Sequence, residues 1–410
     1  MKAIHTLTLD CGATLVVEQI EEVASAAMTW LLPVGSSTDD QQGQGISTIL
    51  GDLIFRGAGN LSSKQHSDAL DRIGVQRSSS VLSQHLRIGC VALGERLQEA
   101  LPLITSMIRE PAFEDDALQA VKSLCLQSLD SLEDEPQRLV MIRLREAHLP
   151  SPFNRHSYGQ RDVLENCSID TLRKAWQTRC TANGTIISAA GAVDPQALCK
   201  QLNDLLSDWS GKLNEPVKEQ QPARGTNHLE QDTAQVHIGI AFDAPREADA
   251  DSMLERLAIA VLSGGSSGRL FTEVRQKRSL CYSVGATYSA GRDRGMVTVY
   301  SGTTPQRAQE TLKVCQDEVK RMEQGVDAHE LKRAITGLKS QIVMQGESTT
   351  ARASAIAQDF YRINRARSLD ELSQEVDQIT LKKLNSYLAS RDFGEFTIYT
   401  VGTTEPAGVA

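Results

Sequence analysis

Apolar and polar residues follow two different periods along this chain. Residues 4–19 (IHTLTLDCGATLVVEQ) alternate apolar and polar side chains, which predicts β-strands, whereas 46–54 (ISTILGDLI) places its apolar residues on a helical period. Short apolar stretches at 185–193 (TIISAAGAV) and 396–402 (FTIYTVG) are typical of strands that close a sheet. The mixture predicts an α+β architecture in which helices pack on a mostly antiparallel sheet.

The pattern occurs twice in the chain. Residues 94–124 resemble 304–338, and 168–193 resemble 378–403, with matching positions separated by 210 to 213 residues. A constant separation at four positions indicates an internal duplication. The alternative is that these are unrelated helix–loop–helix segments of similar composition.

The length of the chain also favours two domains. Its 410 residues exceed the size at which a single hydrophobic core stops growing. The stretch 211–233 is polar, lacks periodicity and contains two prolines, which is typical of a linker. We therefore predict an N-terminal domain at 1–210, a linker at 211–233 and a homologous C-terminal domain at 234–410.

The composition of the chain indicates which classes of partner it can bind and in which cellular compartment it is expected. The net charge of −9 argues against binding to nucleic acid or to an anionic membrane, because such surfaces need clustered lysine and arginine. The longest apolar stretch, 23–34, is too short to cross a bilayer and contains Pro33, and no export signal precedes the first strands. The eight cysteines form no C-x-x-C pair, which is typical of free thiols in a reducing compartment. We predict a cytoplasmic protein.

Five motifs occur along the chain at a specific spacing. They are TLDCGATLVVEQ (8–19), PVGSSTDD (33–40), FRGAG (55–59), LSGGSSGRLFTEVRQKRSLCYSVGATYSA (262–290) and VYSGTTP (299–305). Together they resemble the pitrilysin and mitochondrial processing peptidase family of inverted-motif zinc metallopeptidases, over about residues 4 to 403. The most specific part is 262–302, where a Gly-Gly turn, Arg-Leu-Phe, Arg and Tyr follow one another at the family's spacing. The resemblance implies two homologous α+β domains arranged as a clam shell around a chamber for extended peptides.

The helix predicted at 46–54 matches the zinc-binding helix of catalytic members, which carry His-x-x-Glu-His shortly before a Phe-Lys/Arg-Gly turn. Aligned on the Phe-Arg-Gly turn at 55–57, Thr48 and Asp52 take the two histidine positions and Gly51 takes the glutamate position. Two imidazoles at i and i+4 share a helix face and can bind one zinc ion, while the glutamate acts as a base. Threonine is a poor ligand and glycine has no carboxylate, so the zinc site is degenerate.

The third zinc ligand of the family is a glutamate on a later helix. Aligned on Asp-Glu-Pro at 134–136, this chain has Ser128 at that position. The eight histidines include no His-x₂-His or His-x₃-His pair, so no other local ligand set replaces the missing one. We expect this chain to bind no metal and no cofactor, and we expect the zinc ion in a partner subunit.

The second half retains two residues that catalytic members bring to the zinc site, as the resemblance implies. These are Arg275 and Tyr282, seven residues apart. Arginine can donate charge-assisted hydrogen bonds to a peptide carbonyl, and a tyrosine hydroxyl can donate to an oxyanion. The alternative is a surface arginine and a half-buried core tyrosine. The turn at 263–268 is interpreted first as a strand-to-helix connection, and contact of Gly264 and Gly265 with substrate is the alternative.

These residues lead to a functional hypothesis. We predict the non-zinc subunit of a heterodimeric metallopeptidase, inactive alone, which binds peptide substrates and supplies Arg275 and Tyr282 in trans to a homologous zinc-bearing subunit. A catalytically silent scaffold or interaction protein of the same fold is the alternative, and an autonomous zinc endopeptidase is a third. No nucleic-acid or membrane partner is expected.

Overall fold

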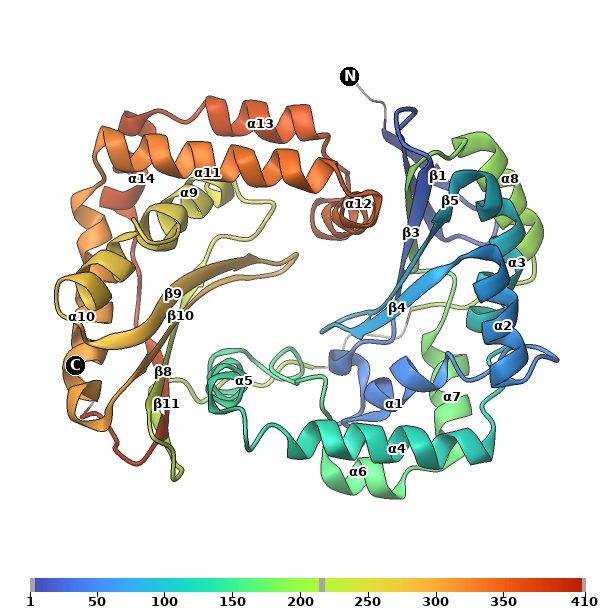
Figure 1. Cartoon of the computed structure of the whole chain (residues 1–410), viewed down its shortest axis with the longest axis horizontal. Helices are drawn as coiled ribbons and strands as arrows, with labels where there is room; N and C mark the ends of the chain where they lie inside the picture. Colours follow the sequence, from blue (N-terminus) through green and yellow to red (C-terminus); the bar gives the residue numbers. More distant parts are fainter. Residues whose placement is uncertain (1–3, 214–217, 408–410) are drawn as a thin grey trace. The chain divides into compact units, whose positions relative to one another are not determined.

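The computed structural model describes residues 4–213 and 218–407, which form two compact α+β units (Figure 1). Each unit has one sheet with helices packed on it, which confirms the predicted two-domain α+β fold. Both units are assembled from three separate segments of the chain. Unit 1 consists of Met1–Ser131, Ser151–Gln220 and Gln345–Ser368, and unit 2 of Leu132–Pro150, Gln221–Met344 and Leu369–Ala410.

The sheet of unit 1 has six strands in the order β1-β2-β6-β3-β5-β4. All neighbouring strands are antiparallel except β2 and β6, which are parallel. The central strand β3 is almost entirely buried because it has neighbours on both sides and packing on both faces. The strands are β1 (Ile4–Thr8), β2 (Thr14–Gln19), β3 (Ser25–Leu32), β4 (Gln76–Val81), β5 (Leu86–Leu93) and β6 (Ile186–Gly191).

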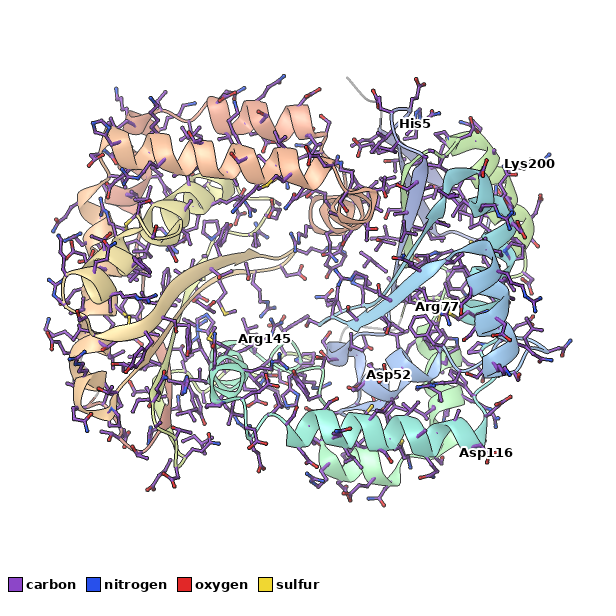
Figure 2. The ribbon with its side chains drawn as sticks, in the orientation of Figure 1. His5, Asp52, Arg77, Asp116, Arg145 and Lys200 are labelled. Carbon is purple, nitrogen blue, oxygen red and sulfur yellow. The ribbon has the colours of Figure 1, made fainter. Side chains whose placement is uncertain are left out.

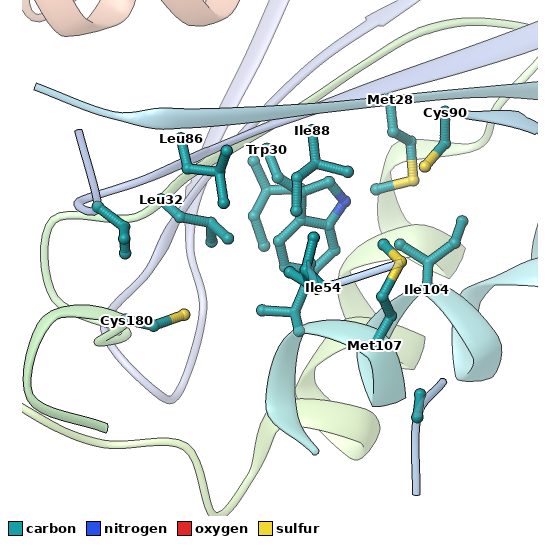
Figure 3. Close-up of a cluster of buried hydrophobic side chains, with 14 of the residues drawn as sticks. Met28, Trp30, Leu32, Ile54, Leu86, Ile88, Cys90, Ile104, Met107 and Cys180 are labelled. Atoms are coloured by element: carbon teal, nitrogen blue, oxygen red, sulfur yellow. The ribbon is translucent and has the colours of Figure 1, made fainter. Parts of the chain in front are cut away.

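One face of this sheet carries the main core of unit 1 (Figure 3). Successive side chains of a strand point to opposite faces, so Met28, Trp30 and Leu32 of β3 all face this core. Ile54 and Met107 pack against them from the helical layer. The helices are α1 (Ile46–Leu53), α2 (Ser63–Ile73), α3 (Gly94–Arg109), α4 (Asp115–Asp130), α6 (Arg161–Asn166), α7 (Ile169–Arg179) and α8 (Pro195–Leu206), with a 3₁₀ turn η1 (Ser36–Thr38).

The sheet of unit 2 repeats this topology with five strands in the order β7-β11-β8-β10-β9. Its parallel pair, β7 and β11, takes the place of β2 and β6, and the other neighbours are antiparallel. The shared order supports the duplication inferred from the sequence. The strands are β7 (Thr226–Glu230), β8 (Val236–Ala244), β9 (Cys281–Ala290), β10 (Gly295–Thr303) and β11 (Thr397–Gly402).

Unit 2 also contains helices and short helical turns. They are α9 (Ser252–Ser263), the π-helical turn η2 (Phe271–Gln276), η3 (Pro305–Arg307), α10 (Ala308–Arg321), η4 (Met322–Gln324), α11 (Ala328–Gly346), α13 (Leu369–Asp377) and α14 (Leu381–Ser390). Strand β7 lies within the stretch 211–233 that we predicted as a linker. This segment forms a strand because its backbone pairs with β11. Residues 214–217 of that stretch lie outside the described residues.

The two halves of the sequence exchange one helix. Helix α5 (Pro136–His148) belongs to the first half but packs on β8 and β11 of unit 2, and α12 (Thr349–Ile363) belongs to the second half but packs on β3 and β6 of unit 1. Their first residues are 213 positions apart, so they are equivalent elements of the repeat. The domains that we predicted, 1–210 and 234–410, are each continuous in sequence and therefore do not describe this exchange.

Two further sequence expectations concern cysteines and membranes. All eight cysteines have free thiols, and five of them are buried. Across 4–213 and 218–407, no helix combines the length and apolar character needed to span a bilayer. The cytoplasmic location stays a prediction.

Candidate functional site

Helix α1, which carries three of the predicted site positions, is anchored at its start by Asp39. The Asp39 carboxylate accepts hydrogen bonds from the backbone N–H groups of Gly45 and Ser47, at 2.9 and 3.1 Å. It also accepts from Ser47 Oγ at 2.7 Å and from Arg179 Nη1 at 2.6 Å. Burial raises the pKa of Asp39, and the charge of Arg179 opposes this shift. Asp39 lies in the PVGSSTDD motif, but its role as an anchor was not predicted from the sequence.

The structure gives each of the three α1 positions a separate environment. Thr48 Oγ1 donates to the backbone carbonyl of Ser157 at 2.9 Å. Gly51 is buried, whereas Asp52 is exposed on α1 (Figure 2). Thr48 Oγ1 is therefore already bonded to the backbone, and Asp52 provides the single carboxylate among the three positions.

From α4, the side chain that reaches Asp52 belongs to Cys125. Its Sγ donates to Asp52 Oδ2 at 3.9 Å, whereas Ser128, one turn further along α4, is exposed. Desolvation raises the pKa of Asp52, although the charge of Arg56 opposes the shift. Burial, together with the Asp52 charge, raises the pKa of Cys125 to about 12. Because the thiol form is favoured, Cys125 has neither the nucleophilicity nor the ligand character of a thiolate.

These residues do not fit a zinc ion. Among Thr48, Asp52 and Ser128, only Asp52 carries a usual zinc ligand, whereas a protein zinc site has at least three. No group of three or more histidine, cysteine, aspartate or glutamate side chains in the described segments is placed to hold a metal. The donor set is therefore that of a degenerate site, and no catalytic step can be derived from it.

Gly51 shows why the family's glutamate cannot simply be restored. A Cβ atom added at Gly51 would lie 3.0 Å from Val81 Cγ2 and 3.4 Å from Leu86 Cδ1. Gly51→Glu should therefore lower the free energy of unfolding by about 1–3 kcal/mol, because it overpacks the contact of α1 with β4 and β5. Urea denaturation measures this change.

Gly337 of α11 provides the matched control, because a Cβ atom there meets no heavy atom within 4 Å. Gly337→Glu should leave stability unchanged or raise it slightly, since glutamate has the higher helix propensity. Equal stability of the two variants would contradict the overpacking at Gly51.

In unit 2, Arg275 and Tyr282 lie at the two ends of a short connection. Arg275 is exposed on η2, and its guanidinium carbon lies 5.0 Å from the centre of the Phe271 ring. Tyr282 is the second residue of β9 and is 62% exposed, so it is not the half-buried core tyrosine of the alternative interpretation. Burial raises the pKa of Cys281, and the charge of Arg275 opposes the shift.

The π-helical geometry of η2 was not predicted. Single π-helical turns occur often at functional sites, because the extra residue in the turn redirects side chains. The backbone carbonyl of Arg275 accepts a hydrogen bond from Ser279 N at 3.0 Å, which closes the connection between η2 and β9.

The glycine-rich turn 263–268 joins α9 to η2, so its interpretation as a strand-to-helix connection was wrong. The residues before it form a helix because their apolar side chains, among them Leu257, Val261 and Leu262, pack into the core of unit 2. Gly265 has φ +89°, which favours glycine. Gly264 and Gly265 line a cavity of about 370 Å³ bounded by β9 and α11. Ser263 Oγ accepts from Ala286 N of β9 at 2.7 Å, which ties the turn to that strand.

Comparisons with known proteins agree with these features. The family model described as Insulinase (Peptidase family M16) matches residues 14–159, and the one described as Peptidase M16 inactive domain matches residues 166–338. The uncharacterized zinc protease YmxG of Bacillus subtilis is 25% identical over 414 residues, which cover 99% of each chain.

Solved structures share the fold. A structure described as the peptidase M16 inactive domain from Pseudomonas fluorescens has a TM-score of 0.89 at 18% identity and covers 99% of this chain and 100% of its own. A chain of Complex III2 from Candida albicans has a TM-score of 0.83 at 17% identity, with coverage of 98% and 96%.

Proposed function

This chain belongs to the M16 family of peptidases, and from that premise we propose that it is the non-zinc subunit of a heterodimeric metallopeptidase. In this proposal it binds peptide and supplies Arg275 and Tyr282 in trans to a homologous zinc-bearing subunit. The first half retains the helix of the zinc site without its ligands, and the second half retains the arginine and tyrosine.

The exposure of Arg275 and Tyr282 carries the proposal. Tyr282 is 62% exposed, although burial of a tyrosine ring would stabilise the fold, and Arg275 contacts Phe271 with its guanidinium carbon 5.0 Å from the ring centre. Both polar ends are therefore available to a bound substrate. In the complex, the partner subunit supplies the metal. Arg275 donates to the carbonyl of the bond to be cleaved, and the Tyr282 hydroxyl donates to the oxyanion that forms.

Strand β9 supports the binding of an extended peptide. It lies at the edge of its sheet, with β10 as its neighbour, and Tyr282 is its second residue. A peptide that adds to such an edge gains main-chain hydrogen bonds, while pockets beside the strand select side chains. The turn with Gly264 and Gly265 contacts the middle of β9 and bounds one such pocket.

Activity measurements on the mixed subunits test the proposal. We expect the chain to raise cleavage of a fluorogenic peptide by a homologous subunit with an intact His-x-x-Glu-His motif. Arg275→Ala or Tyr282→Phe should reduce kcat by about 100-fold, since each removes a donor to the oxyanion or the carbonyl. Arg246→Ala is the control, because Arg246 forms an exposed pair with Asp249 at 2.7 Å. Size-exclusion chromatography checks that every variant assembles with the partner.

Stimulation by both variants as strong as by the original chain would contradict the catalytic role of the pair. Stable assembly without any effect on turnover would favour the silent scaffold. The chain of Complex III2 that shares this fold is compatible with that alternative. Stoichiometric zinc and chelator-sensitive hydrolysis by the chain alone would show an autonomous endopeptidase.

A further inference from the structure

The segment that joins Arg275 to Tyr282 lies within a cluster of cationic side chains. Two of them, Lys277 and Arg278, belong to the segment itself, and Arg307 Nη1 donates to the backbone carbonyl of Ser279. Arg321 of α10 reaches Glu273 of η2 with a separation of 3.8 Å between Nη2 and Oε1. We refer to Arg275, Lys277, Arg278, Arg307 and Arg321 as the basic cluster.

Two buried carboxylates hold the basic cluster in place from the protein side. Glu273 accepts from Lys277 Nζ at 2.7 Å and from Arg278 Nη1 at 2.8 Å, and its own side chain is 10% exposed. Glu318 pairs with Arg321 at 2.9 Å. The bonds from Lys277 and Arg278 lower the pKa of Glu273 to about 2, so this anchor stays charged at neutral pH.

The outer sides of the same cations face solvent. The exposed fractions of the side chains are 61% for Lys277 and 40% for both Arg278 and Arg321. Within the described residues, the hydrogen bonds of Arg278 all use Nη1, which leaves Nε and Nη2 for another acceptor. Cations fixed by buried partners have already lost much of their conformational entropy, so binding an anion costs less.

The cluster also has an excess of positive charge. Glu273, Glu318 and Glu310 act on Lys277, Arg278 and Arg321. Arg275 instead lies over the Phe271 ring and Arg307 donates to a backbone carbonyl, and neither has a carboxylate partner among the described residues, so these two cations are the local excess in a chain whose net charge is −9. A local excess of this size attracts a small anion and is too limited for the extended phosphate contacts of a nucleic acid. Because Lys277 and Arg278 lie between Arg275 and Tyr282 in the chain, the cluster points to an anionic group on the peptide substrate.

We propose that the basic cluster binds carboxylate side chains of the substrate, so that this chain selects acidic peptides. The inference rests on the proposed function, since it assumes that peptide binds beside Arg275 and Tyr282. The carboxylate of a glutamate or aspartate can accept two parallel N–H groups from one arginine. Arg278 and Arg307 therefore bind such a carboxylate more strongly than they bind a neutral amide.

Two peptides with blocked termini test this selectivity. They are identical except that one has glutamate and the other has glutamine at alternate positions. Fluorescence anisotropy measures Kd for each peptide with the full chain. We expect the glutamate peptide to bind about tenfold more tightly at an ionic strength of about 0.05 M, and the preference to shrink at about 0.5 M because of screening.

The double variant Arg278→Gln/Arg307→Gln should bind both peptides with similar Kd values, because it removes the two arginines proposed to bind carboxylates and leaves Glu273 paired with Lys277. Lys313→Gln is the matched control, since Lys313 is an exposed lysine of α10 paired with Asp317 at 2.6 Å and should keep the full preference. Circular dichroism verifies that all variants fold.

The outcomes separate this inference from the proposed function. Equal affinity of the original chain for both peptides would overturn the acidic selectivity and leave peptide binding intact. A preference that survives in the double variant would overturn the assignment to the basic cluster. Binding of neither peptide would overturn the peptide-binding part of the proposed function, and the selectivity with it.

Discussion

Arg352→Met should lower the free energy of unfolding by about 3–5 kcal/mol, because it leaves the Glu18 carboxylate buried without its cation. The pair joins α12 to β2 of unit 1, and the exposed fractions of the two side chains are 1% and 3%. Arg352 Nη2 also donates to the backbone carbonyl of Arg367 at 2.5 Å, so the substitution leaves that acceptor without this donor. Unfolding in urea measures the loss.

Two further variants show whether the cost comes from an unpaired buried charge. Arg352→Met combined with Glu18→Leu removes both charges and should recover most of the lost stability, since apolar side chains of similar volume often replace a buried pair without cost. Lys339→Met breaks the more exposed pair with Asp377, whose side chains are 36% and 55% exposed, and should cost less than about 1 kcal/mol. An Arg352→Met variant no less stable than Lys339→Met would contradict the argument.

The sequence could predict the features that depend on local pattern. Apolar periodicity located α1, and the repeat of about 211 residues implied two sheets of the same topology, which the order of the strands supports. The environment of the site depends instead on contacts between distant residues. Asp39 and Arg179 are 140 residues apart, and no periodicity connects them.

The case of α4 shows a second limit. The Asp-Glu-Pro turn gave a position in the sequence for the family's third ligand, and that position is occupied by Ser128. Which side chain of a helix faces a neighbour depends on how the helix is rotated in the packed layer, and here that side chain is Cys125. The thiol that contacts Asp52 could therefore not be predicted from the sequence.

The exchange of α5 and α12 could not be predicted for a different reason. Equivalent helices of a duplicated chain have similar apolar faces, so each can cover its own sheet or the sheet of the other repeat, and the pattern of the sequence is the same in both cases. Only the contacts distinguish the two arrangements. Ile356 of α12 packs on Val16 and Leu31 of unit 1, whereas Leu144 of α5 packs on Ala241 of unit 2.

The exchange predicts that neither half of the chain folds alone. A fragment of residues 1–213 lacks α12 and should expose the second face of its sheet, where Ala27 and Ala190 pack on Ala353 and where Val16 and Leu31 pack on Ile356. A fragment of residues 214–410 lacks α5 and should expose Ala241 and Met296. We therefore expect each fragment to aggregate or to bind a hydrophobic dye, without a cooperative unfolding transition.

Co-expression of the two fragments is the decisive control, because it supplies both exchanged helices without restoring the covalent link. We expect the fragments to copurify as a 1:1 complex with a cooperative transition, since the buried contacts of α5 and α12 act between chains as they do within one. Arg352→Met in the second fragment should weaken that complex, because Arg352 pairs with Glu18 of the first fragment. Lys339→Met should not, because Lys339 pairs with Asp377 of its own fragment. A fragment of residues 1–213 that unfolds cooperatively by itself would show that α12 is dispensable for unit 1.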